Sequence, residues 1–214
     1  MIIQLFIAAI IVSGTAHIVA DYKQKWSLTY LFKPLTMLLI IGLLLLKADL
    51  EVSYNQWILL GLVFSLVGDI FLMLRPQKFI AGLVSFLVAH LCYVYAFYQG
   101  LIGNDISWLA AVLLPIGIIY LAILWKHLGK YLWPVVAYFM AIGAMLFFAS
   151  ALFLVEMSLM TKLALLGAIL FAISDAILAW RKFVKPLKYG QFYVMATYFS
   201  AQTLLTLSAI HYWT

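Results

Sequence analysis

The chain has 214 residues, of which 68% are hydrophobic and only 9% charged, and its mean hydropathy is +1.15. Soluble domains are about half apolar and about a quarter charged, so these residues cannot cover a water-facing globule. The net charge of +6 does not indicate nucleic acid as a partner, because the Lys and Arg residues lie in short segments between apolar runs, which is the pattern of membrane topology.

In chain order, eight apolar segments approach the length of about 20 residues that a membrane-crossing helix needs. They are Ile2–Ala20, Pro34–Ala48, Gln56–Leu74, Phe79–Tyr98, Ile106–Trp125, Leu132–Val155, Lys162–Trp180 and Phe192–Trp213. The first lacks a basic flank and a small-residue cleavage site, so we expect a retained span rather than a signal peptide. The second is short unless Tyr30–Lys33 extends it. The loops leave no room for an extramembrane domain, so we expect one all-α transmembrane domain over residues 1–214.

The basic residues predict the orientation of these spans. Eleven of the 13 Lys and Arg residues follow spans one, three, five and seven, and the other side has only Lys47 and Lys162. Because cytoplasmic loops carry the excess of Lys and Arg, these odd-numbered loops should be cytoplasmic. Both termini would then lie on the non-cytoplasmic side, and the short loops suggest a bacterial inner membrane.

The two halves of the chain, residues 1–104 and 105–214, resemble each other. Leu59-Leu60-Gly61 recurs as Leu165-Leu166-Gly167, and at the same offset of 106 residues Gly68-Asp69 matches Ser174-Asp175. Four spans in each half predict a parallel internal repeat with its axis along the membrane normal. Chance similarity between apolar helices is the alternative.

Asp69 and Asp175 are the most informative residues, because ionisable groups inside spans are costly and indicate function. Each lies six residues before an arginine, Arg75 or Arg181, and so about 9 Å inside its helix end. They must face a neighbouring helix or a hydrated cavity. A carboxyl group away from water resists ionisation unless a cation is near, and a protonated carboxyl can act as a general acid. The alternative is that both only form interhelical hydrogen bonds.

Other polar residues fall in the same half of the membrane and predict a polar chamber open to the cytoplasm. They are His17, Asp21, Lys33, His90, Tyr93, Tyr138, Tyr198, Gln202, Arg75 and Arg181. His90 could instead be a core histidine, and His17 and Asp21 could be interfacial. Lys33 could contact anionic lipid, the tyrosines could serve packing, and the arginines could set topology. No metal-ligand pattern is convincing, since zinc sites need three or more clustered ligands.

Three motifs carry a family resemblance: Gly68-Asp69-x-x-Leu72-Met73, Ala89-His90-x-x-Tyr93 and Ser174-Asp175-x-x-Leu178-Ala179. With these in this order, the chain resembles the YhhN family of lysoplasmalogenase-like membrane proteins over nearly its whole length. The resemblance implies an eight-helix membrane enzyme. It also implies cleavage of the vinyl ether bond of lysoplasmalogen, which yields a fatty aldehyde and glycerophosphoethanolamine or glycerophosphocholine.

The residues agree with that chemistry. Vinyl ether hydrolysis needs a positioned acid, a negative group to stabilise the oxocarbenium ion and a base to guide water. Two carboxylates with different environments can supply these roles, so Asp69 and Asp175 are the candidate pair, with His90 as a further catalytic residue. Lys33, Arg75 or Arg181 could bind the lipid phosphate, and no metal or cofactor is required. This assignment assumes that the third and seventh helices approach each other.

A transporter or proton-coupled carrier is the alternative, because parallel repeats and membrane aspartates suit it as well. Against a carrier, Gly and Pro interrupt the spans little, mainly at Pro115 and Gly117, whereas carriers often have broken helices. A non-catalytic lipid-binding protein is a third possibility. The sequence leaves the headgroup, the role of each aspartate and the oligomeric state open.

Overall fold

The computed structural model describes residues 1–74, 76–101 and 108–212, with the backbone alone for 108–112. The described residues form eight α-helices, a 3-10 helix at Gly129–Tyr131 and no strand, which confirms the all-α class. The helices are α1 (Ile2–Tyr22), α2 (Trp26–Lys47), α3 (Ser53–Met73), α4 (Phe79–Tyr98), α5 (Trp108–Leu128), α6 (Leu132–Val155), α7 (Leu159–Phe183) and α8 (Gly190–Ile210).

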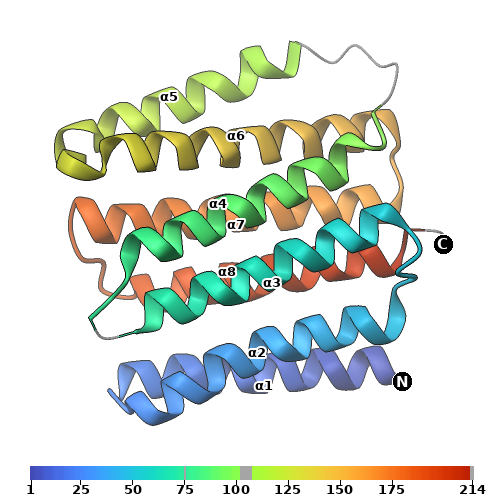
Figure 1. Cartoon of the computed structure of the whole chain (residues 1–214), viewed down its shortest axis with the longest axis horizontal. Helices are drawn as coiled ribbons and strands as arrows, with labels where there is room; N and C mark the ends of the chain where they lie inside the picture. Colours follow the sequence, from blue (N-terminus) through green and yellow to red (C-terminus); the bar gives the residue numbers. More distant parts are fainter. Residues whose placement is uncertain (75, 102–107, 213–214) are drawn as a thin grey trace.

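The helices lie roughly along one direction, with α1 and α2 at one side of the bundle and α5 and α6 at the other (Figure 1). The remaining helices, α3, α4, α7 and α8, occupy the middle. In the first half α1 packs on α2, α2 on α3 and α3 on α4, and in the second half α5 packs on α6, α6 on α7 and α7 on α8. Between the halves, α2 meets α8 and α4 meets α6. Helix α8 also contacts α1 and α3, whereas α4 contacts neither α5 nor α7 within the described residues, so the two halves do not pack identically and the repeat stays a prediction.

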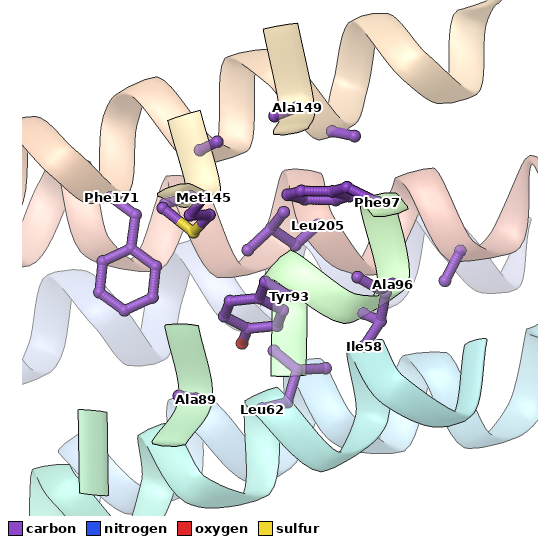
Figure 2. Packing of buried hydrophobic residues seen from close by; sticks show 14 of the residues in the cluster. Ile58, Leu62, Ala89, Tyr93, Ala96, Phe97, Met145, Ala149, Phe171 and Leu205 are labelled. Atoms are coloured by element: carbon purple, nitrogen blue, oxygen red, sulfur yellow. The ribbon is translucent and has the colours of Figure 1, made fainter. Parts of the chain in front are cut away.

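The core lies where α4 fills the space between α3, α6 and α8. Figure 2 shows the rings of Tyr93 and Phe97 on α4 pointing into it, beside Leu205 and Met145. Tyr93 fits only because Gly61 on α3 has no side chain, since a Cβ there would lie 2.2 Å from Tyr93 Cε1. Small residues allow this close approach of membrane helices.

Helix α2 corrects one prediction. Pro34 was expected to open the second span, but the helix begins at Trp26 and Pro34 lies inside it. Beside Pro34, the Phe32 carbonyl accepts hydrogen bonds from the hydroxyls of Thr36 at 2.7 Å and Ser13 at 3.4 Å. The missing N–H of Pro34 frees the carbonyl of Tyr30, four residues earlier, so these two hydrogen bonds do not replace the lost backbone bond, and the one from Ser13 connects α1 with α2. The correction places Lys33 two turns inside a helix rather than in a loop.

Helix α5 also differs from expectation. The helix runs through Pro115 and Gly117 from Trp108 to Leu128 without a break in the described backbone. The expected interruption is therefore absent from this part of the chain. It was the feature of the sequence that most resembled the broken helix of a carrier.

Six stretches of the described residues are long and apolar enough to cross a membrane, and one of them, Leu113–Val155, runs through both α5 and α6. The chain is thus an integral, multi-pass membrane protein. Helix α8 is not among the six. Several of its polar side chains, including Gln202, Thr206 and Ser208, are buried inside the bundle. These polar side chains lower the mean hydropathy of α8, although they face the bundle interior rather than lipid.

Candidate active site

Helix α3 presents Asp69 to the bundle interior. The buried face of α3 follows helical spacing and includes Gly61, Ser65, Gly68 and Asp69. Gly68 lets the ring of Phe86 on α4 approach closely, because a Cβ at position 68 would lie 2.7 Å from that ring. The Asp69 side chain is therefore enclosed, and the residue is only 1% exposed.

Asp69 is held by a cation and a phenol. Lys33 Nζ on α2 lies 2.9 Å from Oδ1, and the hydroxyl of Tyr198 on α8 donates to Oδ2 at 2.7 Å. Both partners are buried. The ammonium and the hydroxyl offset part of the cost of burying the Asp69 carboxyl group.

Asp175 on α7 has a different pair of partners. The hydroxyl of Tyr138 on α6 donates to Oδ2 at 2.7 Å, and His90 Nε2 on α4 lies 3.3 Å from the same oxygen. His90 is fully buried, and its Nδ1 lies 2.7 Å from the Phe86 carbonyl oxygen. Since a carbonyl only accepts, Nδ1 must carry a hydrogen. Nε2 has no hydrogen bond of good geometry within the described residues, so its 3.3 Å contact with Asp175 is an ion pair only when the imidazole is protonated.

The two aspartates use equivalent helices. Each lies on the third helix of its half and is bound by the second helix of the same half and the fourth helix of the other half. For Asp69 these are α2 and α8, and for Asp175 they are α6 and α4. The backbone arrangement is alike at the two sites while the partner chemistry differs, with Lys and Tyr at one and His and Tyr at the other.

The expectation that the third and seventh helices approach each other directly is wrong for the described residues, because α3 and α7 make no backbone contact. The two carboxylate clusters are instead connected through aromatic rings. Phe171 on α7 packs on Tyr198 at 5.6 Å and on His90 at 4.5 Å between ring centroids, and Phe86 packs on both Phe171 and Tyr198. Sequence reasoning missed both phenylalanines, since nothing distinguishes them from other apolar helix residues.

Tyr93 and Gln202 form a further buried contact, from α4 to α8. The Tyr93 hydroxyl donates to Gln202 Oε1 at 2.8 Å, and Ser65 Oγ lies 3.5 Å from the same hydroxyl. Neither residue is recorded in contact with an aspartate oxygen. Both side chains are buried, and their hydrogen bond joins α4 to α8 rather than completing either carboxylate cluster.

A polar cavity of about 310 Å³ opens beside the Asp69 cluster, between the end of α1, the start of α2 and the end of α3. Its lining is His17, Asp21, Trp26, Thr29, Tyr30, Lys33, Leu72, Met73, Leu74, Gln77 and Gln191. Three of these, His17, Asp21 and Lys33, were predicted as site residues. Gln77 and Gln191 were not, because they lie in or next to loops where polar residues are ordinary.

A smaller, apolar crevice of about 30 Å³ reaches the Asp175 cluster between α3, α4, α6 and α7. Asp175 and Tyr138 lie in its wall among aliphatic and aromatic residues, and Leu72 lines both this crevice and the polar cavity. Leu72, on α3 one turn beyond Asp69, thus borders a polar space and an apolar one.

The predicted arginines contribute less. Arg75 lies outside the described residues. Arg181 Nη1 donates to Gln191 Oε1 at 2.6 Å and so orients a side chain of the polar cavity. Among the described residues there is no group of three or more His, Cys, Asp or Glu side chains placed to bind a metal ion.

The chain matches the YhhN family over residues 28–209. It is 37% identical to human lysoplasmalogenase TMEM86B over 159 residues, which cover 74% of this chain and 65% of the human protein. It is 39% identical to bovine lysoplasmalogenase TMEM86A over 158 residues, 72% of this chain and 65% of that protein. It is also 28% identical to the Escherichia coli O157:H7 membrane protein YhhN over 200 residues, 94% of this chain and 96% of that protein. No solved structure matches the chain.

Proposed function

The chain belongs to the YhhN family, and we propose that it is a membrane-embedded lysoplasmalogenase. It would hydrolyse the vinyl ether bond of lysoplasmalogen to a fatty aldehyde and glycerophosphoethanolamine or glycerophosphocholine. The names of the mammalian relatives support this activity, although the chain spans only about 65% of their length.

The observation that carries the proposal is the match between the polarity of the site and that of the substrate. A lysoplasmalogen runs from a polar headgroup through glycerol and the ether oxygen to C1, C2 and the alkyl chain. The site runs from the polar cavity beside Lys33 and Asp69, past Leu72, to the apolar crevice beside Asp175. In the lipid, the vinyl ether lies where the molecule changes from polar to apolar. In the site, the corresponding position would be between the carboxylates of Asp69 and Asp175.

We assign the general acid to Asp175 and His90. Hydrolysis begins with protonation of C2, on the tail side of the ether, and this pair lies at the apolar crevice, where it would hold the proton that C2 receives. Transfer of that proton to C2 converts the alkene to an oxocarbenium ion. It also leaves the pair one unit more negative, so the acid then stabilises the cation that it has created.

Asp69 then acts on the head side. Water from the polar cavity adds to C1, and its proton passes to Asp69, whose orientation Lys33 and Tyr198 maintain. The hemiacetal collapses as its hydroxyl proton returns to the Asp175–His90 pair and the Asp69 proton passes to the ether oxygen. The C1–O bond breaks, aldehyde and glycerol hydroxyl are released, and both carboxylates regain their starting states.

We also propose that all eight helices cross the bilayer, as two parallel four-helix repeats with the cation-rich loops in the cytoplasm. The polar cavity lies at the same end of the bundle as Lys23 and Lys25, in the turn between α1 and α2. Substrate would then enter from the cytoplasmic leaflet, with its headgroup at the mouth of the cavity.

The test measures aldehyde release from lysoplasmenylethanolamine by purified protein in detergent, without a gradient. We expect activity in the wild type and a loss of about 10²-fold or more in Asp69→Asn, Asp175→Asn and His90→Gln. Asp49→Asn, which changes an exposed aspartate, is the matched control. In deuterated water the aldehyde should carry one deuterium at C2.

Each result separates the alternatives. Full activity in well-folded Asp175→Asn would overturn the acid assignment. The absence of aldehyde from folded wild type on both common headgroups would reject the hydrolase and favour transport, which would then require sealed vesicles to detect.

A further inference from the structure

We propose that the polar cavity is a phosphodiester-binding site in which His17 and Lys33 bind the phosphate of the lysophospholipid headgroup. This binding would not depend on whether the hydrocarbon chain of the lipid is attached through a vinyl ether. This inference deepens the proposed function and rests on it for the identity of the substrate. The juxtaposition that carries it is a buried imidazole without hydrogen bonds and a buried ammonium, both lining one cavity.

His17 is the first observation. It is 1% exposed; its ring approaches the Thr29 backbone, but within the described residues neither ring nitrogen makes a hydrogen bond of good geometry. The ring packs edge-on against Phe199 at 5.9 Å, which orients it without using its nitrogens. Buried polar groups are nearly always hydrogen-bonded, and an exception in a native structure calls for an absent partner such as a ligand or water. The cavity on which His17 borders is where such a partner can reach it.

Lys33 is the second observation. An ammonium group has three donors, and the one acceptor recorded for Lys33 within the described part of the chain is Asp69 Oδ1. Its side chain lines the same cavity as His17. Lys33 has donors beyond the one that Asp69 accepts, and His17 has no acceptor of good geometry, so the two nitrogen groups favour an anion with several oxygens.

Gln191 adds a further donor. Its Oε1 accepts a hydrogen bond from Arg181, so its amide nitrogen is the end that remains for a ligand in the cavity. His17, Lys33 and the Gln191 amide nitrogen can donate to an oxyanion, whereas the Asp21 carboxylate in the same lining suits the ammonium of a headgroup. The volume of about 310 Å³ is at the lower end of the ~300–1,000 Å³ range of ligand sites, which is large enough for a headgroup but not for a whole lipid.

The aromatic lining indicates which headgroups fit. Trp26 and Tyr30 lie in the same wall, and aromatic rings bind the ammonium groups of ethanolamine and choline. The phosphate and ammonium of one zwitterionic headgroup would thus both have partners. It follows that the headgroup product and ordinary acyl lysophospholipids should compete with the substrate.

Binding can be measured apart from catalysis with full-length Asp175→Asn protein in detergent. The probes for calorimetry are glycerophosphoethanolamine, inorganic phosphate and glycerol. We expect glycerophosphoethanolamine to bind, phosphate to bind at least tenfold more weakly and glycerol not to bind. His17→Gln should weaken glycerophosphoethanolamine binding at least fivefold, whereas the matched control His127→Gln, at an exposed position near the end of α5, should not.

In the active protein, His17→Gln should raise KM for lysoplasmenylethanolamine with little change in kcat, since it removes a contact that substrate and transition state share. Should His17→Gln fail to fold, Gln191→Leu tests the same site. Unchanged binding and KM in a folded variant would overturn the proposal, and equal affinity for phosphate and glycerophosphoethanolamine would assign the cavity to free phosphate instead. Binding that depends on His17 in a protein that releases no aldehyde would reject the hydrolase while supporting the headgroup site.

Discussion

At the scale of single residues, the pairing of Lys33 with Asp69 shows how the bundle accommodates charge. Both side chains are nearly inaccessible, and the ammonium lies 2.9 Å from the carboxylate. Removing one partner of a buried pair leaves an uncompensated charge, whereas removing both can be almost neutral. The sequence predicted that each residue is functional, but not that they are partners, since they are 36 positions apart on different helices.

A double-mutant cycle tests this pair. Lys33→Met should destabilise the protein by about 3–5 kcal/mol, because Asp69 would remain buried without its cation. The further change Asp69→Asn should restore most of that loss. Thermal unfolding in detergent measures both, with Lys185→Met in an exposed position as the control. If the two single changes simply add, the ion pair has no energetic role.

At the scale of helices, small residues decide how closely α3 and α4 pack and therefore where Asp69 lies. A similar contact occurs in the second half: Gly61 receives Tyr93 from α4, and Gly167, 106 positions later, receives Leu205 from α8.

A matched pair of glycine substitutions checks this packing. Gly61→Ala should lower the stability by about 1–3 kcal/mol, since the new Cβ would overlap the buried Tyr93 ring and force a shift of α4. Gly143→Ala on α6, where nothing lies within 4 Å of an added Cβ, should be neutral or slightly stabilising. Equal melting temperatures for the two variants would show that the close contact carries no stability.

Proline was the least reliable guide at this scale. Pro34 was interpreted as a helix start and Pro115 as an interruption, but both lie within continuous helices. Prolines are tolerated in membrane helices because neighbouring groups satisfy the freed backbone. The carbonyl that Pro34 frees is that of Tyr30, and a sequence does not reveal which neighbour will satisfy such a group.

At the scale of the whole molecule, the distribution of basic residues predicts which way the bundle sits in the membrane. The single cysteine, Cys92, is buried, so a Cys92→Ala background suits labelling with a membrane-impermeant maleimide in intact cells. Glu51→Cys and His211→Cys should react directly. Lys185→Cys should react only after permeabilisation. Labelling of positions 185 and 211 from the same side would show that α8 does not cross.

The sequence by itself determined the class of the protein: apolar runs of spanning length, basic loops and the spacing of two aspartate motifs are local properties, and the family match confirms the resemblance that these motifs carry. Only the tertiary structure decided the partners of each aspartate. Those partners come from helices adjacent in space but distant in sequence, and helix packing sets their distances. Helix packing also places the polar cavity at Lys33 and the apolar crevice at Asp175 next to each other. Leu72 can border both because several helices converge there.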